Sequence, residues 1–170
     1  MCLTVKDKKV RIAENDIVCY KIVIEKISPS PILATYFMSS EIKLGKLYRK
    51  KGDKFRFYKS YEDNFFIEEG GYHVFAKLND AVDYFSEDEV DKKKLLTREG
   101  TCFSPLGYSR AKIIKAIIPK GTPYVVGEFR FSKSHSTRSR LSGWDNWTFE
   151  TKISESICTK AVIYKELDED

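Results

Sequence analysis

Apolar side chains alternate with polar ones along much of this chain, which is the period of a half-buried β-strand. The clearest segment is 17–27, where Val18, Tyr20 and Ile22 occupy one face and Lys21 occupies the other. A Ser-Pro-Ser-Pro run follows this segment. It ends the strand, because proline lacks the N–H group that a sheet ladder needs.

The same pattern predicts further strands at 32–38, 45–50, 54–59, 72–76, 110–118, 124–131, 144–151 and 156–166. We expect 45–50 and 54–59 to pair as a hairpin, because Lys51-Gly52-Asp53 lies between them as a turn. Four isoleucines within 110–118, followed by Pro119, favour a buried strand over a helix.

One helix is predicted after the 72–76 strand. Asn79 is a good N-cap, and the apolar residues Leu78, Ala81, Val82 and Phe85 have the spacing of one helix face. Residues 86–94 are highly charged and either extend this helix or form a loop. The elements add up to an α+β, mainly β fold.

At 170 residues the chain has the length of one domain. We therefore expect a single compact domain, 1–170, of roughly eight strands with one or two short helices. We expect residues 1–14 and the acidic residues 166–170 to lie at its periphery.

Charge is distributed in blocks, although the net charge is only +5. Residues 43–59 hold eight basic side chains and one acid, 62–91 hold ten acids and one lysine, and 110–140 hold eight basic side chains and one acid. Two interpretations stay open: a phosphate-binding face with an acidic counter-face, or solvated surfaces that pair with each other.

The cysteines indicate a reducing compartment. Cys2, Cys19, Cys102 and Cys158 form no C-x-x-C pair, and none adjoins a histidine, so we expect buried thiols and no metal site. The first residues contain no apolar segment of a signal peptide, and no run is apolar and long enough to span a membrane. These features predict a cytoplasmic protein that makes no membrane contact.

The best candidates for ligand binding lie in the second basic block. Residues 132–142 are basic and serine-rich, and we expect them to form a loop followed by two tryptophans. Cations and hydroxyls would hold a phosphate or a nucleic-acid backbone, and indole rings would stack on bases. Alternatively, the segment is a polar loop beside two core tryptophans. Together with the 43–59 block, the candidate ligand-binding residues are Lys133, His135, Arg138, Arg140, Trp144, Trp147, Lys50 and Lys51.

A double glycine, Gly70-Gly71, precedes a short aromatic strand that carries His73. Such a turn indicates that the backbone approaches something closely. His73 would serve as a proton carrier or a metal ligand, or else as a half-buried strand residue bonded to a carbonyl group.

Four segments in order resemble a group of small proteins of gut Bacteroidales bacteria and bacteriophages, to which no activity is assigned. They are the Y-K strand at Tyr20-Lys21, the G-K-x-Y element at 45–48, the G-[FY]-H motif at 71–73 and the I-P-K-G-x-x-Y turn at 118–124. The resemblance covers about residues 15–127. It implies a phage or prophage setting and no catalytic residue.

Pro119-Lys120-Gly121 followed by Tyr124 also resembles, more weakly, the late strands of ADP-ribosyltransferases. This resemblance implies an NAD site. If the chain were an enzyme of that kind, the residues involved would be Tyr20, Lys21, His73 and Glu150. Tyr20-Lys21 departs from the family's pattern, since its first strand carries an Arg or a His that grips NAD.

The common motifs of NTPases, Rossmann proteins, zincins and serine hydrolases are absent from the sequence. We therefore expect a non-enzymatic interaction domain without a cofactor. Its partner would be a host or phage protein, or an anionic ligand such as a nucleotide or nucleic acid. The alternatives are a nucleotide- or NAD-binding protein with an ADP-ribosyltransferase-like core, and a virion or assembly component.

Overall fold

A computed structural model of the chain describes residues 3–26, 32–35, 40–59, 64–67, 70–85, 109–138 and 145–168, with only the backbone given for 109–110, 132–138 and 145–149. The strands are β1 (Thr4–Val5), β2 (Arg11–Ile12), β3 (Ile17–Lys26), β4 (Ile32–Thr35), β5 (Glu41–Ile42), β6 (Leu47–Arg49), β7 (Phe57–Lys59), β8 (Phe65–Ile67), β9 (Tyr72–Phe75), β10 (Ser109–Ile118), β11 (Pro123–Arg138), β12 (Asp145–Thr159) and β13 (Ala161–Lys165), and the helix is α1 (Leu78–Phe85).

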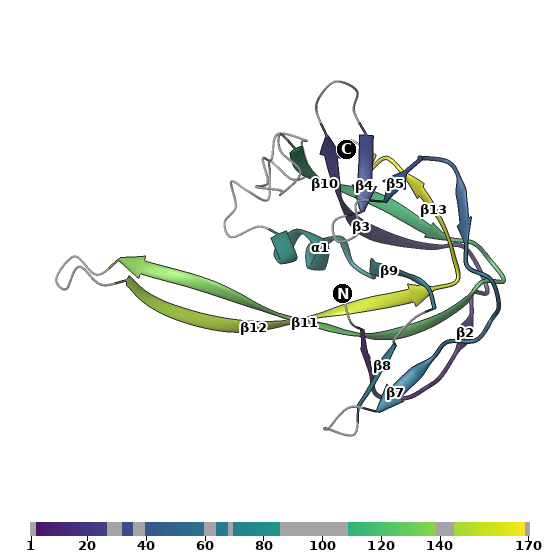
Figure 1. Cartoon of the computed structure of the whole chain (residues 1–170), viewed down its shortest axis with the longest axis horizontal. Coiled ribbons are helices and arrows are strands. Elements are labelled where there is room, and N and C mark those ends of the chain that lie inside the picture. The colour runs from purple at the N-terminus through teal and green to yellow at the C-terminus, as the bar shows by residue number, and fades with distance from the viewer. Residues whose placement is uncertain are drawn as a thin grey trace.

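Within these described ranges, thirteen strands form one antiparallel sheet (Figure 1). Its main path runs β6-β13-β10-β3-β9-β12-β11-β1-β8-β7, with β2 added to β11, and β4 and β5 continuing from β3. The predicted domain of eight strands with one or two helices is therefore wrong, because the described residues form a larger sheet with a single short helix. The additional strands are mostly two to four residues long, too short to produce a recognisable alternation.

Strand β9 connects the two halves of the sheet. It pairs with β3 at Tyr20↔Phe75 and with β12 over four residue pairs. On one side lie β3, β10, β13 and β6, and on the other β12, β11, β1, β8 and β7. The chain also passes directly between the halves, because only one residue, Lys160, separates β12 from β13.

The outer part of the β11–β12 hairpin extends away from the rest of the sheet (Figure 1). We call residues 132–138 and 145–151 the arm. The register runs without interruption to Arg138↔Asp145, so the expected loop at 132–142 is wrong for 132–138. Its polar, serine-rich composition lacks the apolar face that marks a strand packed on a core, and the strand is specified instead by pairing with β12.

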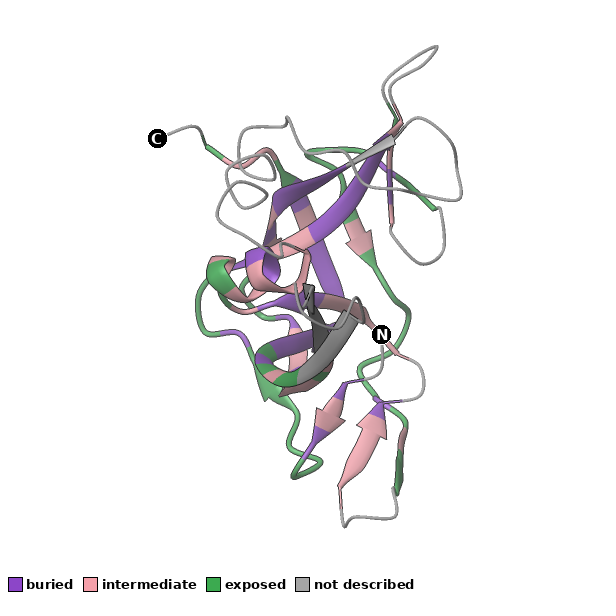
Figure 2. Cartoon of the chain, turned by 90° about the vertical axis from the view of Figure 1, so that its left-hand side faces the viewer, coloured by how far each residue is buried: buried purple, intermediate pink, exposed green. Residues whose placement is uncertain are grey.

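Buried residues gather on the central strands (Figure 2). One cluster lies between β3, β10, β12 and β13 and includes Cys19, Ile114 and Val162. A second lies under α1, where Ala81 and Val82 pack with residues of β3, β9 and β10. The helix begins at Leu78, one residue before the predicted cap.

The third cluster includes the N-terminal segment. Leu3 and Val5 are fully buried with Phe55, Val125 and Cys158, although we expected residues 1–14 to be peripheral. Alternation around Val5 is too short to predict burial, and the contact depends on β1 pairing with β11 and β8.

The predicted hairpin of 45–50 with 54–59 is also wrong. β6 pairs with β13 and β7 pairs with β8, so the basic residues between β6 and β7 form a connection between different parts of the sheet. Alternation indicates a strand and its buried face but does not specify its partner.

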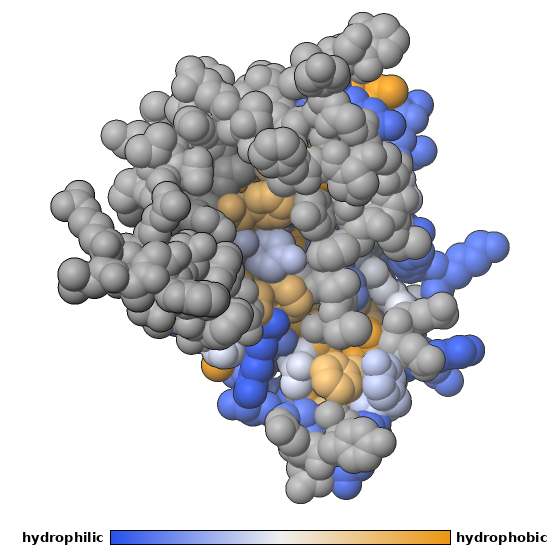
Figure 3. Space-filling view, turned by 60° about the vertical axis from the view of Figure 1, so that its left-hand side comes forward, coloured by the Kyte–Doolittle hydropathy of each residue, from blue (hydrophilic) through white to orange (hydrophobic). Residues whose placement is uncertain are grey.

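The surface is mixed. In the view of Figure 3, hydrophobic residues are visible in the middle of the face and hydrophilic ones gather along its margins. Among the described residues, no helix has the length and apolar character needed to cross a bilayer.

Candidate functional site

The one-residue corner at Lys160 is fixed by hydrogen bonds on several sides. The Lys160 N–H donates to Pro123 O at 3.0 Å, and the Lys160 carbonyl accepts from Lys50 N at 2.8 Å. The Thr159 hydroxyl donates to Ala161 O at 3.0 Å, which braces the corner itself. The backbone therefore holds Lys160 in one position between β11 and the segment after β6.

The Lys160 side chain is buried although it carries a charge. The residue is only 4% exposed, and its Nζ lies 4.6 Å from the centre of the Phe55 ring. Among the described residues, no carboxylate forms an ion pair with this ammonium group. A cation–π contact offsets part of the desolvation cost of a buried ammonium but supplies no counter-charge.

Thr122 lies beside this corner in the turn between β10 and β11. Its N–H donates to Pro119 O at 3.2 Å, and its carbonyl accepts from Ala13 N at 3.0 Å. The residue is 3% exposed, and its hydroxyl oxygen is buried without a hydrogen-bond partner. A buried hydroxyl of this kind costs about 1–3 kcal/mol, so it indicates a missing partner such as a water molecule or a ligand.

Lys160 and Thr122 are both among the residues that line one cavity of about 250 Å³, which is formed by residues 49–53 together with Thr122, Pro123, Lys160 and Ala161. We call it the cationic pocket. Arg49, Lys50 and Lys51 are exposed side chains at its margin, and Asp53 is the one acid among the lining residues. The lining therefore carries a surplus of three positive charges.

The double glycine identified from the sequence packs against this corner. A Cβ atom on Gly71 would lie 2.5 Å from Thr159 O and 2.7 Å from Cys158 Sγ. Gly70 has a φ of +145°, and a Cβ there would lie 3.3 Å from Lys160 Nζ. The predicted close approach is thus confirmed, and it is an approach to the chain's own corner at 158–160.

His73 lies next to this region on β9, opposite Cys158. Burial and the nearby Lys21 ammonium lower the pKa of His73 to about 4, and its Nδ1 is buried without a hydrogen-bond partner. Lys21 Nζ donates to His73 O at 2.9 Å, and burial lowers the pKa of Lys21 to about 8. His73 is therefore neutral at physiological pH.

The two cysteines among the described residues, Cys19 and Cys158, are buried free thiols. Burial raises the pKa of each to about 12, although Lys160 and Lys21 act in the opposite direction on Cys158. Both thiols stay protonated and unreactive as nucleophiles. In the described part of the chain, no three His, Cys, Asp or Glu residues are grouped to hold a metal ion.

The structure separates the predicted ligand-binding residues into two sets. Lys50 and Lys51 line the cationic pocket. Lys133, His135 and Arg138 are arm positions on β11, and Trp147 lies opposite Ser136 on β12, while Arg140 and Trp144 fall outside the described residues. Lys133 is ten residues beyond Pro123, or about 33 Å along the strand.

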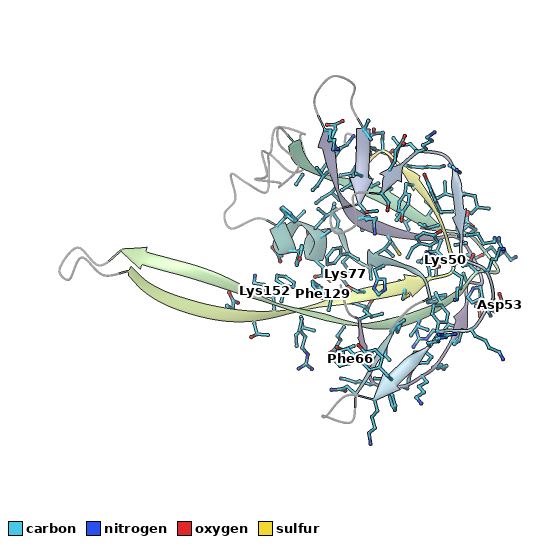
Figure 4. The ribbon with its side chains drawn as sticks, viewed as in Figure 1. Lys50, Asp53, Phe66, Lys77, Phe129 and Lys152 are labelled. Carbon is cyan, nitrogen blue, oxygen red and sulfur yellow. The ribbon has the colours of Figure 1, made fainter. Side chains whose placement is uncertain are left out.

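In Figure 4, Lys50 and Asp53 lie towards the right of the molecule, and Lys152, next to the arm on the hairpin, lies to their left. The cationic pocket and the arm therefore do not form one binding surface. The alternation of basic blocks along the sequence does not reveal this distance.

The candidate enzymatic residues are likewise not assembled. Tyr20 and Lys21 on β3 adjoin β9 and its His73. Glu150 is an exposed residue opposite Lys133, eight residues along β12 from the partner of His73, or about 26 Å.

Sequence reasoning missed Lys160, Thr122 and Arg49 as site residues. Lys160 did carry a signal, because it interrupts the otherwise uncharged run from Ser156 to Tyr164. A lysine within such a run indicates either the end of a strand or a buried charged side chain that has a functional role. The sequence around Thr122 carried no such signal, since the burial of its unpaired hydroxyl depends on tertiary contacts.

Comparisons with protein-family models, with curated proteins and with solved structures find no match to this chain.

Proposed function

We propose that this protein is a non-enzymatic interaction domain that binds an anionic ligand, or an anionic group of a partner, in the cationic pocket. The observation that carries the proposal is the buried Lys160, whose ammonium group has no carboxylate partner among the described residues and which lines the same cavity as Thr122, a residue with an unpaired hydroxyl. An anion would supply the counter-charge and the hydrogen-bond acceptor that these groups lack.

The exposed cations at the margin support the same proposal. Arg49, Lys50 and Lys51 would attract an anion to the pocket, and Lys160 would hold it after desolvation. The backbone at both residues is already fixed by hydrogen bonds, which lowers the cost of ordering the site.

The proposal extends to the setting of the protein. The free thiols of Cys19 and Cys158 support a cytoplasmic location, and the four motifs at Tyr20-Lys21, 45–48, 71–73 and 118–124 support a phage or prophage origin. A host or phage protein that carries a negatively charged group fits this setting as a partner.

Calorimetric titration with tripolyphosphate tests the proposal. Lys160→Met removes the buried charge and keeps the length of the side chain, so we expect affinity to fall about tenfold to a hundredfold, the effect of one charge-assisted hydrogen bond. Raising the salt concentration should weaken the wild-type affinity.

Lys152→Met is the matched control, because it removes the same charge on the hairpin far from the pocket (Figure 4). It should change the affinity less than about twofold, since Lys152 pairs with Phe131, eight residues or about 26 Å along β11 from Pro123, beyond the Debye length of about 8 Å. Equal losses in both variants, or no binding at all, would contradict the proposal.

A further inference from the structure

We infer that the cationic pocket is built for a terminal phosphate group, the dianion of a phosphomonoester, in preference to the diester backbone of a nucleic acid. This inference rests on the proposed function and names the class of its ligand. It follows from the donors inside the pocket, from the surplus charge of its lining and from its size.

The buried groups of the pocket require an acceptor. The Lys160 ammonium has three N–H donors and no acceptor, and the Thr122 hydroxyl has a donor with no partner. Because Lys160 and Thr122 come from separate elements and line the same cavity, one ligand with several free oxygens would supply acceptors for both residues. A terminal phosphate has three such oxygens, whereas a diester has only two that are not esterified.

The charge of the pocket also favours a phosphomonoester over a diester. The lining residues carry a surplus of three positive charges. A phosphomonoester has a charge of about −1.5 to −2 at pH 7, since its second pKa is about 6. A diester or a carboxylate carries one negative charge and would leave more of the surplus uncompensated.

The size of the cavity limits what accompanies the phosphate. Its volume of about 250 Å³ lies below the range of about 300–1,000 Å³ for pockets that enclose drug-sized ligands. The pocket therefore holds the phosphate and a short attachment, and the rest of a larger ligand stays outside. A small phosphorylated metabolite and a phosphorylated side chain share this chemistry.

Methyl phosphate and dimethyl phosphate are the decisive pair of probes, because they differ in one methyl group and one charge. We expect methyl phosphate to bind the full chain at least tenfold more tightly in calorimetry at pH 7.5. Its affinity should fall as the pH is lowered through the second pKa of the ligand, while that of dimethyl phosphate stays constant. Equal affinities for the two probes would overturn the inference.

Thr122→Val tests the hydroxyl with little change in shape. We expect about a tenfold loss of affinity for methyl phosphate and no loss of thermal stability, because the variant removes a buried unpaired hydroxyl. Unchanged affinity in a folded Thr122→Val protein would remove Thr122 from the site and overturn the inference.

Ribose 5-phosphate and a phosphoserine peptide identify the source of the phosphate. Binding of either that depends on both Lys160 and Thr122 supports the inference, and the tighter one identifies the source. If tripolyphosphate binds through Lys160 while methyl phosphate shows no preference over dimethyl phosphate, the proposed function stands and this inference fails. If no anion binds through Lys160, both fail.

Discussion

At the scale of single residues, the structure contains several buried polar groups that lack a hydrogen-bond partner or a counter-charge. His73 is the clearest, because its ring is neutral at physiological pH and its Nδ1 has no hydrogen-bond partner. Burial lowers its pKa from 6.5 to about 4, so the unfolded chain binds this proton at a higher pH than the folded chain. Folding stability must therefore depend on pH in that interval.

We expect stability to fall as the pH is lowered from about 6.5 towards 4, because the unfolded state gains a proton that the native state excludes. At about 1.4 kcal/mol per pKa unit, the contribution of His73 is on the order of 3 kcal/mol. Urea unfolding across this range should show a smaller pH dependence in His73→Gln than in the wild type. His135→Gln, which removes the other histidine, is the control, and the same reduction in both variants would contradict this origin.

At the scale of elements, the inner and outer parts of the β11–β12 hairpin differ in the strands that pair with them. Inside the sheet, β11 pairs with β1 and β2, and β12 pairs with β9, so the inner part has strands on both sides. The arm positions pair only with each other among the described strands. A two-stranded ribbon of this kind is marginally stable by itself.

Backbone amides of the arm should therefore exchange with solvent deuterium faster than those of the central strands. We expect the exchange at Ser134 and Thr148 to be at least tenfold faster than at Ile22 and Ile113, because the arm can open without unfolding the core. Exchange resolved by NMR measures both sets in one sample. Equal protection would mean that the arm opens only when the whole domain unfolds.

At the scale of the whole molecule, the two halves of the sheet depend on the same joint. β9 pairs with a strand of each half, and Gly71 brings its start against Thr159 and Cys158 at the corner of β12 and β13. A defect at this joint should affect the molecule as a unit.

Gly71→Ala should destabilise the domain by about 3 kcal/mol, because the new Cβ would lie 2.5 Å from Thr159 O and the backbone must shift. We expect one unfolding transition at a lower urea concentration, measured by circular dichroism. Gly45→Ala is the control, since Gly45 has a positive φ but open space around it, and its cost should be about 1 kcal/mol. Two separate transitions in Gly71→Ala would show that the halves fold independently.

The sequence by itself determined the features that depend on local backbone geometry. It predicted strands at 17–27, 72–76 and 110–118, which the structure places at 17–26, 72–75 and 109–118. It also predicted the helix near Asn79 and the close approach at Gly70-Gly71, because periodicity, capping and glycine conformation act within a few residues. It also selected Lys50 and Lys51, since basic side chains on a connection between strands are exposed wherever that connection lies.

Only the tertiary structure decided which strands pair and where a pocket forms. Lys50, Thr122 and Lys160 are far apart along the chain and share one cavity, because β6 pairs with β13 and a single residue turns the chain from β12 into β13. Partner choice depends on the packing of the whole sheet, which alternation within one strand does not encode. For the same reason, Lys50 and Lys51 of the first basic block line the pocket, whereas Lys133 and Arg138 of the second lie on the outer part of the β11–β12 hairpin.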